Sequence, residues 1–224
     1  AGMDLALENF PNASKITVAG SSAGGVGAAA FAPFLTRFLY GNKAKQLTVL
    51  NDAGPIVSNP QAIAAADARA RDWNFQQFYP ASCTDCDVRG QQTALIHWRL
   101  ANDSTVREAF YGTDGDETDI GFTSLNLPGA PFVVPFDPIN GVFGLNQELY
   151  RGLIESEHGA LEAAYPERYK RFIVSGDDSH TALQSPLFYS QQVEGVLLND
   201  WTGHFVSPRK PFWIDLVQEF IPLP

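Results

Sequence analysis

The sequence has few cysteines, an acidic charge balance and no long apolar segment. Only Cys83 and Cys86 occur in 224 residues, which excludes a disulfide-rich scaffold and leaves a structural zinc site without a second cysteine pair. Lys and Arg number 15 against 25 Asp and Glu, a net charge of -10, which disfavours nucleic acid and anionic membrane surfaces as partners. No apolar run approaches the roughly 20 residues of a membrane-spanning helix.

The composition, with 45% hydrophobic and 12% aromatic residues, is that of one soluble globular domain over residues 1–224. Residues 1–10 lack the features of a signal peptide and resemble the end of an amphipathic helix. We therefore expect the C-terminal portion of a larger fold, with its N-terminal strands supplied elsewhere, for example by a separate N-terminal chain.

Cys83 and Cys86 lie in a polar loop after Phe78-Tyr-Pro80, whereas a thioredoxin-like redox motif needs a strand before it and a helix at it. A local disulfide is the favoured interpretation. Asn12-Ala-Ser14 and Asn102-Asp-Ser104 fit the glycosylation acceptor pattern, a weak sign of secretion. We expect a secreted or periplasmic protein.

The order of predicted elements favours an α/β fold with a mostly parallel sheet flanked by helices, because strand, helix and strand alternate. The proline-, glycine- and phenylalanine-rich residues 123–144 are expected to form an irregular insertion, a candidate lid or pocket loop. The expected strands cover 15–20, 46–52, 105–113 and 169–175, and the expected helices cover 23–40, 61–79, 91–100, 146–164, 195–201 onward and 212–220.

Ser22 lies in Gly20-Ser-Ser22-Ala-Gly24, between a short apolar strand and a helix of small residues. This pattern is typical of a nucleophile elbow, in which a serine stands on a strained turn and Gly20 and Gly24 leave room for strand and helix to pack. The alternatives are a glycine-rich turn without chemistry or a phosphate loop, but neither a Lys-Ser/Thr pair nor a Gly-x-Gly-x-x-Gly motif follows. A nucleophilic serine is the favoured reading.

A serine nucleophile needs a histidine base, and the order nucleophile, acid, histidine selects one of four histidines. His180 follows the predicted strand that ends at Ser175, so it should lie at the carboxyl edge of the sheet, where the elbow also opens. His204 is the second choice. His97 and His158 lie in predicted helices and are interpreted as structural.

Two aspartates are candidates for the acid. Asp116 follows the predicted strand 105–113, and Asp137 follows the apolar run 132–136; we favour Asp116. Asp52 could serve in a variant arrangement, although Asp-Ala-Gly there more simply caps a turn. The amide of Ala23 is the expected oxyanion donor, and a second donor would come from a loop after an earlier strand.

The motifs Gly20-Ser-Ser22-Ala-Gly, Asn51-Asp-Ala-Gly54, Tyr79-Pro-Ala-Ser-Cys83 and Gly176-Asp-Asp-Ser-His180 resemble those of the pectin acetylesterase and Notum-like carboxylesterases. The resemblance implies an α/β-hydrolase fold, removal of acetyl or longer acyl groups from carbohydrate or protein esters, and a Ser-His-Asp triad with Ser22 as nucleophile and His180 as base. The family often has Asp-x-x-Gln at its acid, whereas Asp119 or Asn140 stands in the glutamine position here. The single cysteine pair is nearer to bacterial members.

We therefore expect a serine carboxylesterase that hydrolyses small acyl esters, such as acetate on a polysaccharide, through Ser22, His180 and Asp116, with no metal and no cofactor. The insertion 123–144 would shape the acyl pocket. Two alternatives remain: a lipase or polyester depolymerase with the same triad, and a non-catalytic binding module whose apolar insertion holds a partner.

Overall fold

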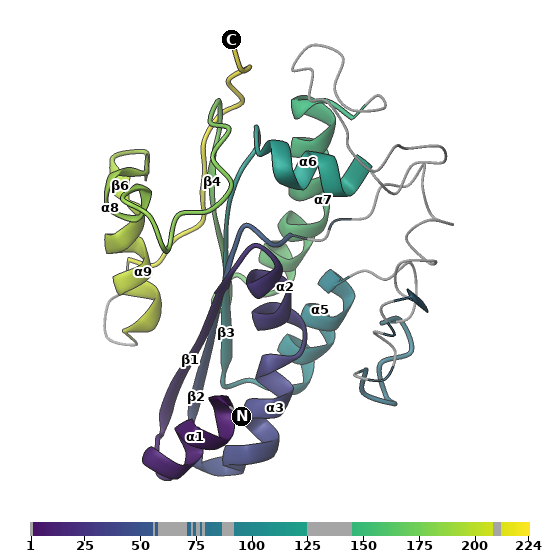
Figure 1. Cartoon of the computed structure of the whole chain (residues 1–224), viewed down its shortest axis with the longest axis vertical. Helices are drawn as coiled ribbons and strands as arrows, with labels where there is room; N and C mark the ends of the chain where they lie inside the picture. Colours follow the sequence, from purple (N-terminus) through teal and green to yellow (C-terminus); the bar gives the residue numbers. More distant parts are fainter. Residues whose placement is uncertain are drawn as a thin grey trace.

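The computed structural model describes residues 2–55, 57, 71–72, 74, 77, 79–86, 92–124, 145–207 and 212–224. In this part of the chain the main sheet has five parallel strands in the order β1-β2-β3-β4-β7 (Figure 1). The expected α/β architecture with a parallel sheet is confirmed. The strands are β1 (Lys15–Ser21), β2 (Gln46–Asp52), β3 (Val106–Thr113), β4 (Tyr169–Val174) and β7 (Leu216–Val217).

Helices cover both faces of the sheet, as a parallel sheet requires. In Figure 1 the helices α2, α3, α5 and α7 lie on one side, and α8, α9 and the small hairpin of β5 and β6 lie on the other. Their bounds, with those of the remaining helices, are α1 (Gly2–Asn9), α2 (Ala23–Ala30), α3 (Ala32–Tyr40), η1 (Gly41–Lys43), α5 (Gln92–Asn102), α6 (Glu117–Ser124), α7 (Gln147–Ala164), α8 (Leu187–Ser190), β5 (Gln192–Val193), β6 (Val196–Leu197) and α9 (Leu198–Val206).

Two cores form because successive side chains of a strand point to opposite faces. Phe110 of β3 packs with residues of α5 and α7, including Ile96 and Ile154. Its neighbour Tyr111 packs in the other cluster, which Trp201 of α9 dominates. Strands β2 and β3 are therefore buried on both faces, whereas β1 alternates between exposed and partly buried residues.

A buried ion pair joins α5 to the sheet. Arg99 and Glu108 are both almost fully buried, with Nε and Oε1 at 2.6 Å and Nη2 and Oε2 at 2.7 Å. The guanidinium also donates to the carbonyl of Ala29 at the end of α2. Arg99 thereby connects three elements on this face of the sheet.

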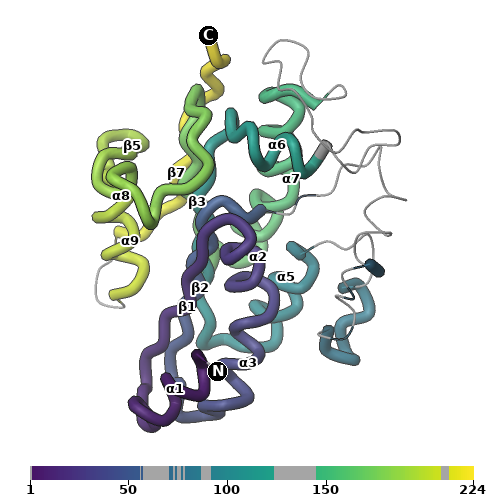
Figure 2. Tube along the Cα trace, viewed as in Figure 1, coloured from purple at the N-terminus to yellow at the C-terminus, as the bar shows by residue number. Residues whose placement is uncertain are grey.

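The register brings the carboxyl ends of the strands to one edge. Ser21 pairs with Asp52, Asp52 with Tyr111 and Tyr111 with Phe172. In the tube of Figure 2, the turn from β1 into α2 and the end of β3 lie toward the same end of the sheet. Loops that leave these strand ends can therefore place their side chains together, which is the usual position of a ligand site in open parallel sheets.

Two sequence predictions about the elements need correction. The expected helix 23–40 is divided at Phe31, because Pro33 at the start of α3 has no amide proton to continue the helical ladder. The expected closing helix 212–220 is wrong: it contains β7, which pairs with Phe172 and Ile173 at the sheet edge. Its apolar residues Trp213 and Leu216 are three apart, a spacing that also suits a helix.

The disulfide between Cys83 and Cys86 is present, with the two Cα atoms 5.4 Å apart, as expected. The predicted insertion 123–144 begins with the last two residues of α6, and its residues 125–144, with Asp137, lie outside the described part of the chain, as does most of the predicted helix 61–79.

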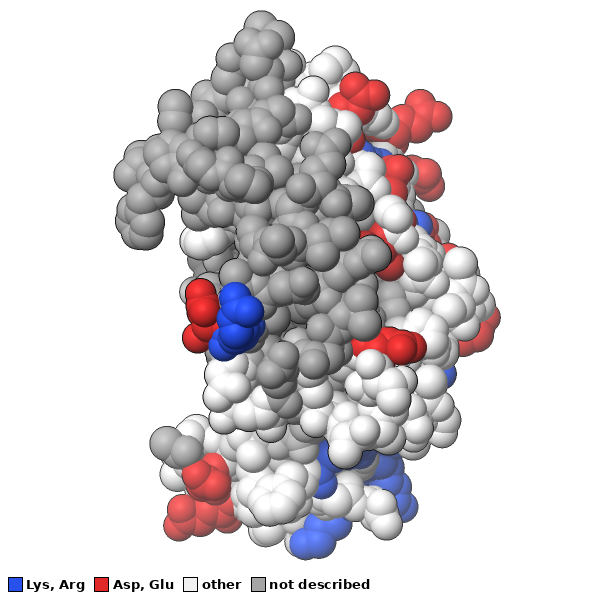
Figure 3. Space-filling view, turned by 90° about the vertical axis from the view of Figure 1, so that its right-hand side faces the viewer, with Lys and Arg blue, Asp and Glu red and all other residues white. Residues whose placement is uncertain are grey.

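The described helices include none with the length and apolarity that crossing a bilayer would require. On the face drawn in Figure 3, red acidic side chains follow the upper right-hand margin, while most of the blue Lys and Arg atoms lie at the lower end. The described atoms of this face form no continuous basic stripe, in keeping with the acidic balance of the sequence.

Candidate active site

Ser22 stands between β1 and α2 in a strained conformation. Its φ of 57° lies in the left-handed region, which L-residues other than glycine rarely adopt and which costs about 1–3 kcal/mol. Two main-chain hydrogen bonds fix the turn: the amide of Ser22 donates to the Asp52 carbonyl at 2.8 Å, and the amide of Val26 donates to the Ser22 carbonyl at 3.1 Å. The turn is a strand-to-helix elbow with Ser22 at its tip.

Close packing at Gly20 makes the turn sharp. A Cβ atom on Gly20 would lie 2.1 Å from the carbonyl oxygen of Gly24, whereas a Cβ on Gly24 would meet nothing within 4 Å. The expectation that both glycines supply room is therefore half correct. Position 20 must be glycine because any side chain there would collide with the backbone of Gly24. Gly24 contributes its carbonyl group to this close contact, and a Cβ atom at Gly24 would meet no other atom within 4 Å.

His180 lies in the loop after β4 and contacts Ser22 directly. Its Nε2 is 2.7 Å from Ser22 Oγ, and its Nδ1 is 2.7 Å from Asp116 Oδ2. The His180 side chain is 25% exposed and that of Asp116 is 1% exposed, so the base meets solvent while the acid is buried. With its proton on Nδ1, the ring donates to Asp116 and accepts from the serine hydroxyl.

Asp116 is held by the helix that it begins. Its Oδ1 accepts the amide of Asp119 at 3.0 Å, which satisfies one of the free donors at the start of α6. Its carbonyl accepts the amide of Ile120 at 2.9 Å. One carboxylate oxygen therefore caps α6 and the other faces His180, so the helix sets the position of the acid.

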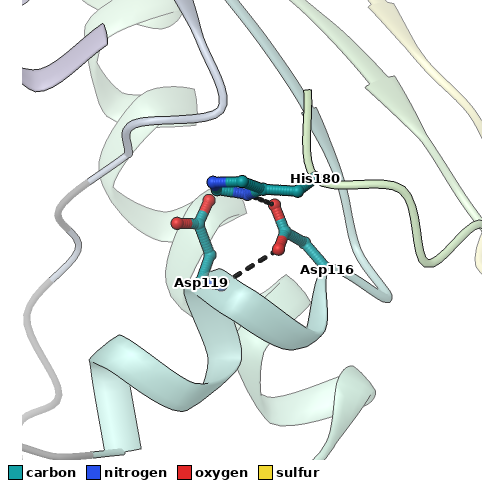
Figure 4. A group of neighbouring side chains, drawn as sticks. All are labelled: Asp116, Asp119 and His180. Atoms are coloured by element: carbon teal, nitrogen blue, oxygen red, sulfur yellow. Dashed lines mark hydrogen bonds and ion pairs between the residues drawn. The ribbon is translucent and has the colours of Figure 1, made fainter. Parts of the chain in front are cut away.

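Asp119 places a second carboxyl group beside the first. Burial, and then the charge of Asp116, raise the pKa of Asp119 well above its usual value, while a hydrogen bond with Tyr150 acts in the opposite direction. Figure 4 shows the carboxyl groups of Asp116 and Asp119 next to the His180 ring. The raised pKa favours a neutral, proton-donating acid at this position.

Asp116, Asp119 and His180 also offer ligand atoms that lie within 4.8 Å of one another. A divalent cation there would need Asp119 ionised and would compete for the groups that hold His180. We therefore assign no metal to this group and describe it as hydrogen-bonding side chains around His180.

Asp114, two residues before Asp116, anchors the end of β3. It is fully buried, and its carboxylate accepts from Arg151 Nη1 at 2.8 Å, from Gln147 Nε2 at 2.7 Å and from the amide of Gly176 at 3.0 Å. Gln147 also receives the amide of Leu223 at 2.8 Å. The ends of β3 and β4, helix α7 and the C-terminal segment are thus joined just behind the Asp116 and His180 loops.

The other histidines lie away from Ser22. His204 is in α9 and packs against Phe212, His97 is exposed on α5, and His158 is fully buried in α7, stacked on Phe110. Burial lowers the pKa of His158 to about 3. None of the three takes part in the hydrogen bonds of Ser22 described above.

Ala23 is exposed and is the first residue of α2, so its amide is among the helix N–H groups that have no acceptor within the helix. The expected oxyanion donor is therefore at the start of the helix, next to Ser22.

Sequence reasoning misjudged Asp52, which it interpreted as a turn cap. The turn after β2 is held by Asn51, whose Nδ2 donates to the Gly54 carbonyl at 2.7 Å, while the side chain of Asp52 reaches the segment after His180. Its position at a strand end beside the elbow is the signal that could have identified it.

Neither protein-family models nor curated proteins gave a match to this chain. Among solved structures, the Wnt deacylase Notum from Drosophila matches with a TM-score of 0.52 at 17% sequence identity. The match covers 94% of this chain and 57% of the Notum chain, so this chain spans little more than half of that structure. Over the part that the two have in common, this chain has the α/β-hydrolase fold of Notum.

Proposed function

We propose that this chain carries the catalytic residues of a serine carboxylesterase. The observation that carries the proposal is the hydrogen-bonded series from Ser22 Oγ through both nitrogens of His180 to Asp116 Oδ2, with 2.7 Å at each step. A strained nucleophile, a partly exposed base and a buried acid are the parts that acyl transfer by serine needs.

In the proposed reaction, Ser22 Oγ attacks the ester carbonyl carbon as its proton passes to His180 Nε2. The tetrahedral intermediate collapses, the proton goes to the leaving alcohol, and the acyl group stays on Ser22. Water then attacks the acyl-enzyme, with His180 again taking and returning a proton. Asp116 keeps the Nδ1 proton in place and stabilises the positive charge on the ring.

The developing oxyanion needs donors, each worth about 3–4 kcal/mol in comparable sites. The Ala23 amide, at the start of α2 next to Ser22, is the proposed first donor. Both the free amide and the positive end of the helix dipole favour negative charge at this point.

The proposed substrate is a small acyl ester, such as an acetyl group on a carbohydrate, by the resemblance of the elbow and histidine motifs to pectin acetylesterases. Notum is named as a Wnt deacylase, so acyl removal is the chemistry that the shared fold is known to support in that protein. Activity on long acyl chains would instead favour the lipase or polyester depolymerase alternative. A chain-length series of p-nitrophenyl esters separates the two.

Intact mass after treatment with a fluorophosphonate, followed by peptide mapping, tests the proposal. We expect a single adduct on Ser22, none in Ser22→Ala, and normal labelling in the matched Ser190→Ala variant, because Ser190 is exposed on α8. An unlabelled but folded wild-type protein would refute the proposal and favour a binding module.

We also propose that the protein works outside the cytoplasm, because disulfides such as Cys83–Cys86 persist in oxidising compartments. Cell fractionation with an antibody against the protein tests this. Recovery of the protein only in the cytoplasm, with both thiols free, would contradict it.

A further inference from the structure

The carboxylate of Asp52 joins the segment that carries Ser22 to the segment that carries His180. Asp52 is the last residue of β2 and is fully buried. Its Oδ1 accepts the amide of Ala182 at 3.0 Å, and its Oδ2 accepts the amide of Leu183 at 3.0 Å. The hydroxyl of Ser21 also donates to Oδ2.

The main chain of Asp52 contacts the nucleophile itself, because its carbonyl accepts the Ser22 amide at 2.8 Å. One residue therefore holds the elbow through its carbonyl and Oδ2, and holds the histidine loop through both carboxylate oxygens. The ring of His180 uses its two nitrogens for Asp116 and Ser22, so Asp52 is not the acid of the site.

The other end of the histidine loop is fixed separately. Thr113 Oγ1, at the end of β3, donates to the Ser179 carbonyl at 2.6 Å. His180 thus lies between a contact to β3 at residue 179 and contacts to β2 at residues 182 and 183. Without the Asp52 contacts, the segment after His180 would lose its two hydrogen bonds to β2 and would be held there by the packing of Ala182 and Leu183 alone.

Both carboxylate oxygens of Asp52 act as hydrogen-bond acceptors. Within residues 2–55 and 145–207, the hydrogen-bond partners of its side chain are two backbone amides and one hydroxyl, all donors. Bonds from such donors to a buried carboxylate are among the stronger hydrogen bonds, and each donor would lose its partner if the acceptor were removed. A side chain at this position therefore satisfies all three donors only if both of its terminal oxygens can accept hydrogen bonds.

We propose that Asp52 is a positioning residue that sets the separation between Ser22 and His180 by tying the elbow to the loop after β4. This inference rests on the proposed serine esterase function. Asp52 itself touches no reacting atom.

Asp52→Asn tests the role with almost no change in size. The amide oxygen can still accept one backbone N–H, but the amide nitrogen then faces the donors that Oδ2 accepted. We expect Ser22 labelling and kcat for p-nitrophenyl acetate to fall by about 10- to 100-fold, since small misplacements of reacting groups have effects of this order. We expect KM to stay unchanged, because the residue is buried behind the site.

A purely structural role would behave differently. It would lower the fraction of protein that fluorophosphonate can label at completion, while the labelled molecules would react at the wild-type rate. The positioning role predicts full labelling at completion with a slower second-order rate. Asp215→Asn is the matched control: Asp215 also accepts a backbone amide, that of Arg171, at 2.7 Å, but it does so between β4 and β7, in a contact that involves neither Ser22 nor His180. Its labelling rate should equal that of the wild type.

Ser21→Ala keeps the test decisive if Asp52→Asn fails to fold. It removes the Ser21 hydroxyl that donates to Oδ2 and leaves in place the Ala182 and Leu183 contacts and the bond from the Ser22 amide to the Asp52 carbonyl. We expect a several-fold slower labelling rate with full labelling at completion. Wild-type rates in Ser21→Ala, or in a folded Asp52→Asn, would overturn the positioning role alone, whereas absence of Ser22 labelling in the wild type would overturn the esterase proposal.

Discussion

The closest approach in the elbow is between Gly20 of β1 and the backbone of α2, and it makes Gly20→Ala an informative substitution. The new Cβ would lie 2.1 Å from the Gly24 carbonyl oxygen and 2.3 Å from its carbon, whereas ordinary contacts begin near 3.4 Å. Both groups are backbone, so no side chain can rotate away. The strand and the helix must separate by about 1.3 Å, or the turn must change its conformation.

This movement has two measurable consequences. Overpacking of this kind costs about 1–3 kcal/mol of stability. Ser22 follows Gly20 by two residues, and a displacement near 1 Å of a reacting group can cost on the order of 100-fold in rate. We therefore expect Gly20→Ala to lose on the order of 100-fold in kcat/KM for p-nitrophenyl acetate while the protein remains folded.

Gly27→Ala is the control, because Gly27 lies in α2 about one turn after Gly24, the residue that Gly20 approaches. A Cβ there would meet nothing within 4 Å, and alanine favours the helix by about 1 kcal/mol over glycine. Rates are normalised to the folded fraction from near-UV circular dichroism. If Gly20→Ala hydrolyses the ester within about twofold of the wild type, the argument that this contact positions Ser22 is refuted.

Three further predictions concern stability and are read from urea unfolding. Burial lowers the pKa of His158 from 6.5 to about 3, so only the unfolded chain binds this proton between those values; stability should fall by about 2 kcal/mol from pH 7 to pH 5, and the fall should be smaller in His158→Gln. Asp119 has a raised pKa, so the folded state keeps a proton that the unfolded state loses above about pH 4; Asp119→Asn removes this effect, so its stability relative to the wild type should increase as pH rises above 4, and a difference that does not change with pH would contradict this. Glu108→Ala leaves the Arg99 guanidinium buried without its partner and should cost about 3–5 kcal/mol, whereas a cost below about 1 kcal/mol would show that water reaches Arg99.

The four long strands could be predicted from the sequence because strands in a parallel sheet are rich in apolar and β-branched residues. Gln46–Asp52 contains Leu47, Val49 and Leu50, Tyr169–Val174 ends in Phe-Ile-Val, and a glycine follows each strand within two residues. The order of these strands, with Ser22 after the first and His180 after the fourth, was enough to predict that both residues lie at one edge. Their 2.7 Å contact agrees with that expectation.

The remaining features depend on contacts between distant parts of the chain. β7 is only two residues long, and its extended form is fixed by pairing with Phe172 and Ile173, which local spacing does not reveal. The role of Asp52 depends on amides 130 and 131 residues later. The raised pKa of Asp119 depends on burial, which a sequence motif does not specify.

The hydrogen bond between Ser22 and His180 joins residues 158 positions apart, and the Asp52 contacts span almost as far. Closing such large loops is entropically costly and slow compared with forming helices and neighbouring strand pairs. The helices and the β1-β2 pair can therefore form early, when the chain still has no activated serine. Reactivity at Ser22 consequently reports the final stage of folding, and a chain that has regained its circular dichroism but not its labelling has stopped just short of the native state.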